Sequence, residues 1–256
     1  MSKLKVTFLG TGTSSGVPMV ACDCDICISD NSKDKRLRSS ILIELEGVSV
    51  VVDTGPDFRY QMLREKVKRL DAIVFTHEHK DHVAGLDDVR AFNHIMKSSM
   101  QIFATERVQT ALKRDFYYAF ETDKYPGVPQ IELNTITNKP FWVEGIKFEP
   151  IELLHYKMPV FGYRVGKFAY VTDANKITDQ ELEKLIGVEV LVINALRESP
   201  HISHFSLNES LDIIKRVAPN KAYLTHLSHQ MPKYDDLLKK LPENVFPSYD
   251  GLVLTV

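Results

Sequence analysis

The stretch Thr76-His77-Glu78-His79-Lys80-Asp81-His82 is the most informative part of this 256-residue chain. An apolar run of strand length, residues 71–75, comes directly before it, and a helical pattern begins directly after it. We therefore expect its histidines and its aspartate on a loop that leaves the carboxyl end of a buried strand. Open α/β sheets place their functional sites at that end.

The spacing within this stretch favours two metal ions. In extended backbone, residues two apart point the same way, so His77 and His79 can converge on one ion. Asp81 and His82 are adjacent and must turn the other way, toward a second ion nearby. The alternative interpretation is a solvated polar loop, but three imidazoles and one carboxylate in six positions are hard to explain in that way.

Composition is that of an ordinary soluble globular protein, with 44% hydrophobic and 26% charged residues. The length fits one large domain or two small ones, and we expect a single domain over residues 1–256. A formal charge of −2 gives no field that would attract nucleic acid or an anionic membrane. The N-terminal apolar run is too short for a signal peptide, and nothing approaches the ~20 apolar residues of a membrane span. We therefore expect a cytoplasmic protein without a membrane partner, and leave a homodimer as one option.

Three cysteines form the second strong signal, in Cys22-Asp23-Cys24-Asp25-Ile26-Cys27. An odd number at this spacing is not typical of a disulfide framework. Three thiolates so close together indicate a structural zinc site that needs one more ligand. The alternative is three unrelated free thiols.

Strand-like and helical patterns alternate along the chain without a clear linker or repeat. Helical patterns are predicted at residues 58–68, 83–96, 106–116, 178–186, 206–218 and 234–240. Two of them begin with a capping box, at Thr178 and at Ser206. One domain with two sheets between outer helices fits this order best. Strands are predicted at residues 4–9, 40–45, 48–53, 72–75, 100–103, 131–136, 146–154, 160–165, 168–171, 188–193, 222–224 and 252–256.

Three further residues repeat the placement of His77. His155, Asp173 and His226 are each the first ionisable residue after an apolar strand. Alone, each is more typical of a satisfied polar residue at a strand end. Together they complete two half-built coordination spheres, because side chains at strand ends on one edge of a sheet can converge.

At this point the chain resembles the metallo-β-lactamase superfamily over nearly its whole length, through His77-x-His79-x-Asp81-His82 and the later ligands in the family's order. The segment Gly10-Thr11-Gly12-Thr13-Ser14-Ser15-Gly16-Val17-Pro18 and the cysteine cluster resemble its PhnP-like branch. That branch contains phosphoribosyl 1,2-cyclic phosphate phosphodiesterases and their relatives. The resemblance implies an α/β fold (α+β in some schemes), an αββα four-layer sandwich with a dinuclear site at one edge.

The resemblance also assigns roles to individual residues. It implies a first metal on His77, His79 and His155, and a second metal on Asp81, His82 and His226, with Asp173 bridging them. It implies that Asp53 orients the ligand loop without binding metal, although a simple turn aspartate is the alternative. It implies a structural zinc that staples the N-terminal loop around residues 10–38, on Cys22, Cys24, Cys27 and His229.

The expected chemistry is hydrolysis of a small cyclic or nucleotide-like phosphodiester. A site of histidines and aspartates without cysteine suits zinc or manganese, and two such ions lower the pKa of a shared water that attacks phosphorus. We count Asp81 as catalytic as well as a ligand. The leaving oxygen needs a proton, and His204 resembles the general acid of ribonuclease Z and PhnP-like enzymes. His201 is the other candidate, as donor or as phosphate contact, and either histidine could instead be an exposed loop residue.

Arg197 and Arg90 are candidate phosphate contacts, with surface salt bridges as the alternative. A tRNA 3′-processing endonuclease of the ribonuclease Z type shares the ligand set but carries a long basic insertion. Here only seventeen residues separate His155 from Asp173, with three basic side chains among them, so we do not expect a nucleic-acid partner. Hydrolysis of a β-lactam, a thioester or another carboxylic ester is the remaining alternative.

Overall fold

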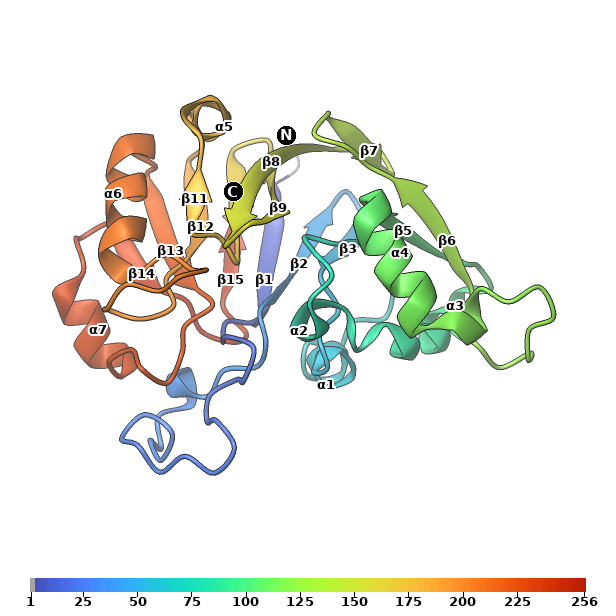
Figure 1. The fold of residues 1–256 in the computed structure, drawn as a ribbon, viewed down its shortest axis with the longest axis horizontal. Helices are drawn as coiled ribbons and strands as arrows, with labels where there is room; N and C mark the ends of the chain where they lie inside the picture. The colour runs from blue at the N-terminus through green and yellow to red at the C-terminus, as the bar shows by residue number, and fades with distance from the viewer. Residues whose placement is uncertain (1–2) are drawn as a thin grey trace.

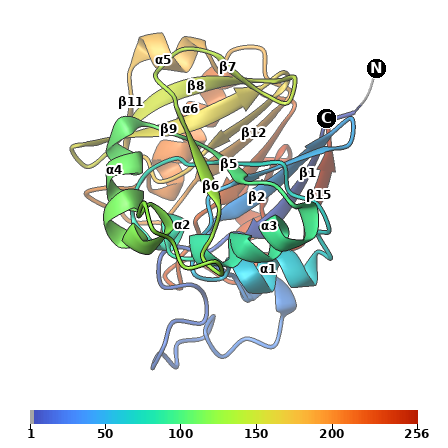
Figure 2. The same cartoon turned by 90° about the vertical axis from the view of Figure 1, so that its right-hand side faces the viewer.

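The computed structural model describes residues 3–256 and shows two sheets packed face to face between two layers of helices (Figure 1). The first sheet has the order β15-β1-β2-β3-β4-β5-β6, and the second has the order β11-β8-β9-β10-β12-β13-β14, with β7 paired to β8. Figure 2 shows α1, α3 and α4 in front of the first sheet. This is the predicted αββα sandwich.

The strands of the first sheet are β1 (Lys5–Gly10), β2 (Ser40–Leu45), β3 (Val48–Val52), β4 (Ala72–Val74), β5 (Met100–Ala104), β6 (Ile131–Thr135) and β15 (Val253–Thr255). Those of the second sheet are β7 (Phe141–Val143), β8 (Ile146–His155), β9 (Met158–Val165), β10 (Phe168–Val171), β11 (Lys176–Ile177), β12 (Val190–Asn194), β13 (Lys221–Thr225) and β14 (Val245–Pro247). Three of these, β7, β11 and β14, are short and were not predicted.

Alternation along the strands divides the apolar residues among three cores. In β10, Phe168 and Tyr170 lie between the sheets, whereas Ala169 and Val171 face the helices of the second sheet. The helices on that side are α5 (Asp179–Glu183), α6 (Leu207–Val217) and α7 (Tyr234–Lys240), and those on the first sheet are α1 (Phe58–Arg64), α2 (Lys80–Val83), α3 (Arg90–Met96) and α4 (Glu106–Asp115).

The helix predicted over residues 83–96 is wrong in its boundaries. Its place is taken by α2, a 3₁₀ helix (Leu86–Val89) and α3. The break follows Gly85, whose N–H donates to the Thr54 carbonyl at 2.9 Å. A Cβ on Gly85 would lie 2.1 Å from the Gly55 carbonyl oxygen, and one on Gly55 would lie 2.1 Å from the Asp81 carbonyl oxygen. The turn after β3 therefore lies in close contact with the metal-ligand segment. The predicted helix is interrupted where this turn packs against it.

Segment 11–38 projects from one end of the sandwich in both views. Within it the structure contains only one short 3₁₀ helix (Ser32–Asp34) and isolated bridges. Among residues 3–256 no helix is long and apolar enough to cross a membrane.

Candidate metal centre

The ligand segment begins as an extended loop after β4 and becomes helical at Lys80. His79 is extended, with φ −63° and ψ 150°, and is the residue before α2. The sequence predicted a loop throughout, so the placement of Asp81 and His82 in the first turn of α2 corrects that expectation. The helical turn also places the His82 ring beside that of His77, with centroids 4.1 Å apart, so the two pairs are less separate than the spacing suggested.

Three imidazoles from two strand ends form the first group of donors. His77 and His79 follow β4, and His155 ends β8. The ring centroids lie 4.7 Å apart for His77 and His79, and 4.9 Å apart for His79 and His155. One nitrogen of each ring lies within 4.8 Å of the others, a spacing that one ion could bridge.

Asp173, which follows β10, lies at the centre of the second group. Its Oδ2 is 3.2 Å from His82 Nε2, and its Oδ1 is 2.8 Å from His226 Nδ1. His82 Nε2 is also 3.3 Å from Asp81 Oδ2. Asp173 belongs to three of the four groups of three donors that the His/Asp cluster contains. This central position is the one that the resemblance implies for a bridging carboxylate.

The carboxylates of the cluster create an environment that stabilises positive charge. Burial alone would lower the pKa of His82, yet the carboxylates of Asp173, Asp81 and Asp53 raise that pKa well above its ordinary value. Burial opposes the charged form of Asp173, but His226 and His82 hold its pKa well below its usual range. Carboxylates that stabilise a proton on a buried imidazole in this way would also stabilise a divalent ion.

Unpartnered nitrogens provide a second test of whether a metal fits. His77 Nε2 is buried and has no hydrogen bond, while its Nδ1 lies 3.0 Å from the Thr76 hydroxyl. A buried polar atom without a partner is costly, and coordination of an ion would satisfy it. The donors are nitrogen and oxygen atoms without sulfur, which suits zinc or manganese. The residues therefore fit a metal centre.

Asp53 contacts the cluster through hydrogen bonds, which is the position that the resemblance implies for it. Its carboxylate accepts from the N–H and the hydroxyl of Thr76, at 2.9 and 2.7 Å, and lies 2.7 Å from His82 Nδ1. It thereby fixes both the start of the ligand segment and the orientation of the His82 ring. Such contacts behind a ligand set its geometry and basicity.

Several of these residues have left-handed backbone. The φ angles are 65° at Asp53, 55° at Asp173 and 55° at His226. This region is uncommon for residues other than glycine and costs of order 1 kcal/mol or more. The chain adopts it at three strand ends that meet at the cluster, so the local backbone is arranged for the site at a cost in stability.

His204 lies against the cluster. Its ring centroid is 4.6 Å from that of His155 and 4.8 Å from that of His226, and its buried Nδ1 has no partner. Burial, with the charge of His226 adding to it, lowers the pKa of His204 to about 3. His201 is the next histidine outward, with its ring 5.3 Å from that of His204.

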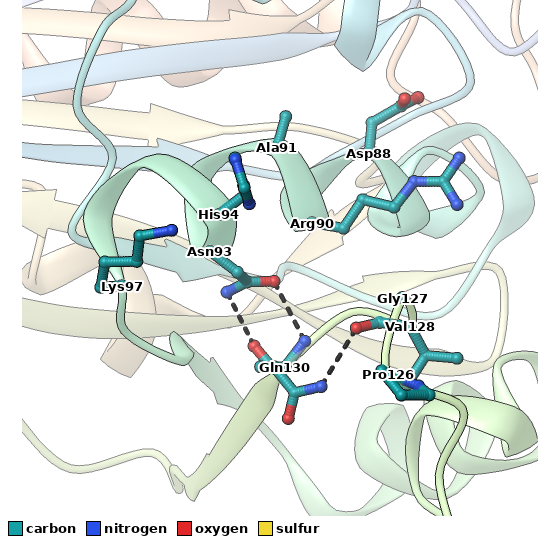
Figure 3. Close-up of a pocket in the computed structure, with 10 residues that line it drawn as sticks. All are labelled: Asp88, Arg90, Ala91, Asn93, His94, Lys97, Pro126, Gly127, Val128 and Gln130. Atoms are coloured by element: carbon teal, nitrogen blue, oxygen red, sulfur yellow. Dashed lines mark hydrogen bonds between the residues drawn. The ribbon is translucent and has the colours of Figure 1, made fainter.

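The two candidate arginines lie elsewhere. Arg197 donates to the carbonyls of Ser199 and Pro200 and to Gln230, and so shapes the loop before His201. Arg90 pairs with Asp87 at 3.3 Å and lines a different pocket, beside the 126–130 loop, among whose lining residues there is no member of the cluster (Figure 3).

The sequence interpretation missed the polar neighbours of His226. Thr13 Oγ1 lies 3.1 Å from its Nε2, and Ser39 Oγ lies 3.2 Å from its Nδ1. Thr13 belongs to the glycine-rich segment 10–18, which was a signal for it. Ser39 had no signal, because it depends on a distant contact: its hydroxyl donates to the carbonyl of Gly12, which pairs with Leu227, the residue after His226.

The three cysteines lie beside His229, the fourth ligand that the resemblance implies. His229 Nδ1 is 3.3 Å from Cys22 Sγ and 3.5 Å from Cys24 Sγ, and all four donors lie within 4.8 Å of one another. A hydrogen bond from the Cys27 backbone, and then His229, lowers the pKa of Cys24 to about 6. Burial raises that of Cys27 to about 11. Three sulfurs and one imidazole are a donor set that fits structural zinc.

Comparisons with known proteins agree with this geometry. Residues 49–227 match the family model of the beta-lactamase superfamily domain. A solved structure described as a new diphosphatase from the PhnP family superposes with a TM-score of 0.93 at 38% identity, covering 99% of this chain and 97% of that one. Human tRNase Z, short form, has a TM-score of 0.71 at 18% identity, with 98% of each chain covered, which shows a shared fold.

Two curated relatives extend the comparison. An octanoyltransferase of Porphyromonas gingivalis is 36% identical over 97% of this chain and 51% of its own length. A ribonuclease Z of Staphylococcus epidermidis is 27% identical over 63% of this chain and 49% of its own length. The chain thus spans about half the length of these relatives. By its family match and its identity to the PhnP-family structure, the chain belongs to the beta-lactamase superfamily and, within it, to the PhnP family.

Proposed function

We propose that this protein is a dinuclear metal-dependent phosphodiesterase that hydrolyses a small cyclic or nucleotide-like phosphodiester. The observation that carries the proposal is the convergence of six residues with nitrogen or oxygen donors around Asp173, with His204 directly against them. His77, His79 and His155 would hold one ion, and Asp81, His82 and His226 the other, with Asp173 shared. Bound divalent ions would supply an activated water and would neutralise charge on the phosphate.

The chain's own residues would handle the proton. His204 is buried and neutral at ordinary pH, since burial lowers its pKa to about 3. An anionic phosphate beside the ring would stabilise its protonated form and raise that pKa toward the range useful for a general acid. The proton would then pass from His204 to the leaving oxygen. His201, closer to solvent, is the second candidate for this role or for a phosphate contact.

A small substrate is favoured over tRNA. Residues 156–172, between His155 and Asp173, are taken up by β9, β10 and their turns, so no inserted arm occurs there. Binding tRNA needs many phosphate contacts outside the catalytic centre. The likeness to ribonuclease Z is at 27% identity or less, and it supports a shared fold only.

A second candidate is hydrolysis of a phosphoric anhydride, because the PhnP-family structure at 38% identity is described as a diphosphatase. Both bonds present a phosphorus centre and charged oxygens to the same donors. Acyl chemistry is the third candidate. The octanoyltransferase relative is about twice as long as this chain, so its name alone does not assign that activity to the matched half.

One panel of substrates tests the proposal. Protein supplied with manganese or zinc is assayed on a ribose cyclic phosphate, bis(4-nitrophenyl) phosphate, a dinucleoside diphosphate, nitrocefin, an acyl thioester and a pre-tRNA. We expect turnover of the first two, and its loss in Asp173→Ala, which excludes a contaminating enzyme. Efficient turnover of the dinucleoside diphosphate alone would replace the proposal by the diphosphatase. Site-specific cleavage of the pre-tRNA, with no turnover of cyclic phosphate, would replace it by the endonuclease.

A further inference from the structure

A buried asparagine makes a pair of hydrogen bonds beside the central carboxylate. Asn194, the last residue of β12, is fully buried. Its Oδ1 accepts from the Ala174 N–H and its Nδ2 donates to the Ala174 carbonyl, both at 3.0 Å. Ala174 is the residue after Asp173. The Asn194 side chain therefore binds both the backbone N–H and the backbone carbonyl of Ala174, next to the site.

This pair of hydrogen bonds continues the sheet where backbone pairing stops. Strands β10 and β12 run parallel, and the last pair in their register is Val171 with Ile193. Beyond this pair, the segment that leaves β10 enters the left-handed conformation at Asp173, with φ 55°. Its backbone can no longer pair with a regular neighbour, and the Asn194 side chain supplies the missing donor and acceptor.

Ala174 and Asn194 also connect this turn to two other parts of the cluster. The Ala174 carbonyl also accepts from the Phe205 N–H at 2.7 Å, which fixes the backbone directly after His204. In the sheet, Asn194 pairs with Thr225, the residue before His226. The Asn194 carbonyl in turn accepts from the Ser210 hydroxyl of α6 at 2.6 Å. Asn194 thus contacts the residue after Asp173 through its side chain, and the strand that precedes His226 through its backbone, while Ala174 connects this turn to the residue after His204.

We propose that Asn194 is a positioning residue, whose side-chain amide holds the Asp173 turn in the geometry that binds the metal pair. The inference rests on the metal role proposed above and is independent of the substrate. Without the amide, the Ala174 N–H and carbonyl would lose partners inside a dry core, and the strained turn would relax. The Asp173 carboxylate would then leave its place between His82 and His226.

The chain contains a matched control for this amide. Asn93, on α3, makes the same pair of hydrogen bonds to Gln130, accepting from its N–H at 3.0 Å and donating to its carbonyl at 3.0 Å (Figure 3). It too fixes a loop to a regular element, and it touches no member of the cluster. Asn93→Ala therefore removes the same kind of hydrogen bonds without moving Asp173.

The experiment measures Mn²⁺ binding and needs no substrate. Wild-type protein and the variants Asn194→Ala, Asn194→Asp and Asn93→Ala are stripped of metal at the His/Asp cluster and titrated with Mn²⁺, with free Mn²⁺ read by electron paramagnetic resonance. We expect Asn194→Ala to weaken binding about 10–100-fold, as is typical when a partner of a ligand is lost. Asn93→Ala should bind as wild type does. Asn194→Asp, which keeps the acceptor and loses the donor, should fall between.

Thermal unfolding of the same samples separates positioning from general stability. Both alanine variants should unfold at lower temperature, but only the Asn194 variants should lose Mn²⁺ affinity. Wild-type Mn²⁺ affinity in folded Asn194→Ala, or an equal loss of affinity in Asn93→Ala, would overturn the inference. If Asn194→Ala does not fold, Asn194→Asp decides, and wild-type affinity in it would also overturn the inference. Absence of Mn²⁺ binding by the wild type would instead overturn the proposed function.

Discussion

The two candidate metal clusters of this molecule are built in opposite ways. The His/Asp cluster lies at the ends of β4, β8, β10 and β13, and its residues are fixed by hydrogen bonds within the protein, such as those of Asp53. The cysteine cluster lies on a segment with almost no regular structure. Its apolar surroundings are a small core of Val17, Ile26 and Cys27, separate from the three large ones.

This difference suggests that the donors of the His/Asp cluster are held in place by the fold, whereas those of the cysteine cluster would be ordered by a bound metal. At the strand ends, the fold already holds the donors together and tolerates left-handed backbone at three of the residues concerned. A loop that buries few apolar groups cannot offset the entropy of its own ordering, so an ion bound there would contribute folding energy directly. Loss of the first metals should therefore remove chemistry, and loss of the second should remove stability.

The largest effect is expected at the centre of the preformed cluster. Asp173→Ala should abolish turnover of bis(4-nitrophenyl) phosphate and lower the metal content, because three groups of donors lose their shared oxygen atoms. His79→Ala should do the same. Metal per chain by elemental analysis and kcat/KM are the measurements. The matched control is Asp212→Ala, which removes an exposed carboxylate of α6 and should keep both values.

A change beside the cluster should separate proton donation from metal binding. His204→Ala should lower the rate about 10²–10⁴-fold on a poor leaving group and leave the metal content intact. The loss should be smaller on a 4-nitrophenyl ester, whose leaving group needs little protonation. His94→Ala, an exposed histidine of α3, is the control. Equal losses of His204→Ala on good and poor leaving groups would exclude a proton-donor role.

The comparison of the two clusters also shows what could be predicted from the sequence. The ligands of the His/Asp cluster stand directly after apolar runs, so local pattern was enough to find His155, Asp173 and His226 as candidates. The capping box at Ser206 is likewise local, and the structure confirms it. The αββα order followed from the resemblance and from the alternation of strands and helices.

Features that depend on distant contacts could not be predicted. Thr178 caps α5 as expected, but Glu181 does not complete the predicted capping box, because its carboxylate binds Asn138 and the Glu152 N–H instead. The start of α2 and the break at Gly85 depend on the turn after β3. Asn194 lies just beyond the strand predicted over residues 188–193, and its amide gains a role only through the left-handed turn at Asp173.

In the cysteine cluster the expected effect is on stability. Cys24→Ser should lower the unfolding midpoint by several degrees, since on a domain of this size about 1 kcal/mol shifts that midpoint by about 2–4 °C. Turnover per folded molecule should change much less. Elemental analysis should fall from three metal equivalents toward two. Asp23→Ser, beside the ligands but outside the cluster, is the control, and wild-type stability in Cys24→Ser would exclude the structural role.

The smallest effects are expected at the two arginines, and they test how far the preformed site extends. Arg197→Ala should lower kcat/KM by roughly fivefold, because the guanidinium's hydrogen bonds to Ser199, Pro200 and Gln230 hold the loop before His201, at about 1 kcal/mol net. Arg90→Ala removes an exposed ion pair with Asp87, and such pairs contribute about 0–1 kcal/mol to stability.

We therefore expect Arg90→Ala to leave KM and kcat within about twofold of wild type, since surface substitutions away from a site usually change little. A rise in KM confined to substrates with an additional phosphate would instead support the phosphate contact that the sequence suggested for Arg90. In that case the substrate reaches from the strand ends to the pocket beside α3, and the preformed region is larger than the cluster itself.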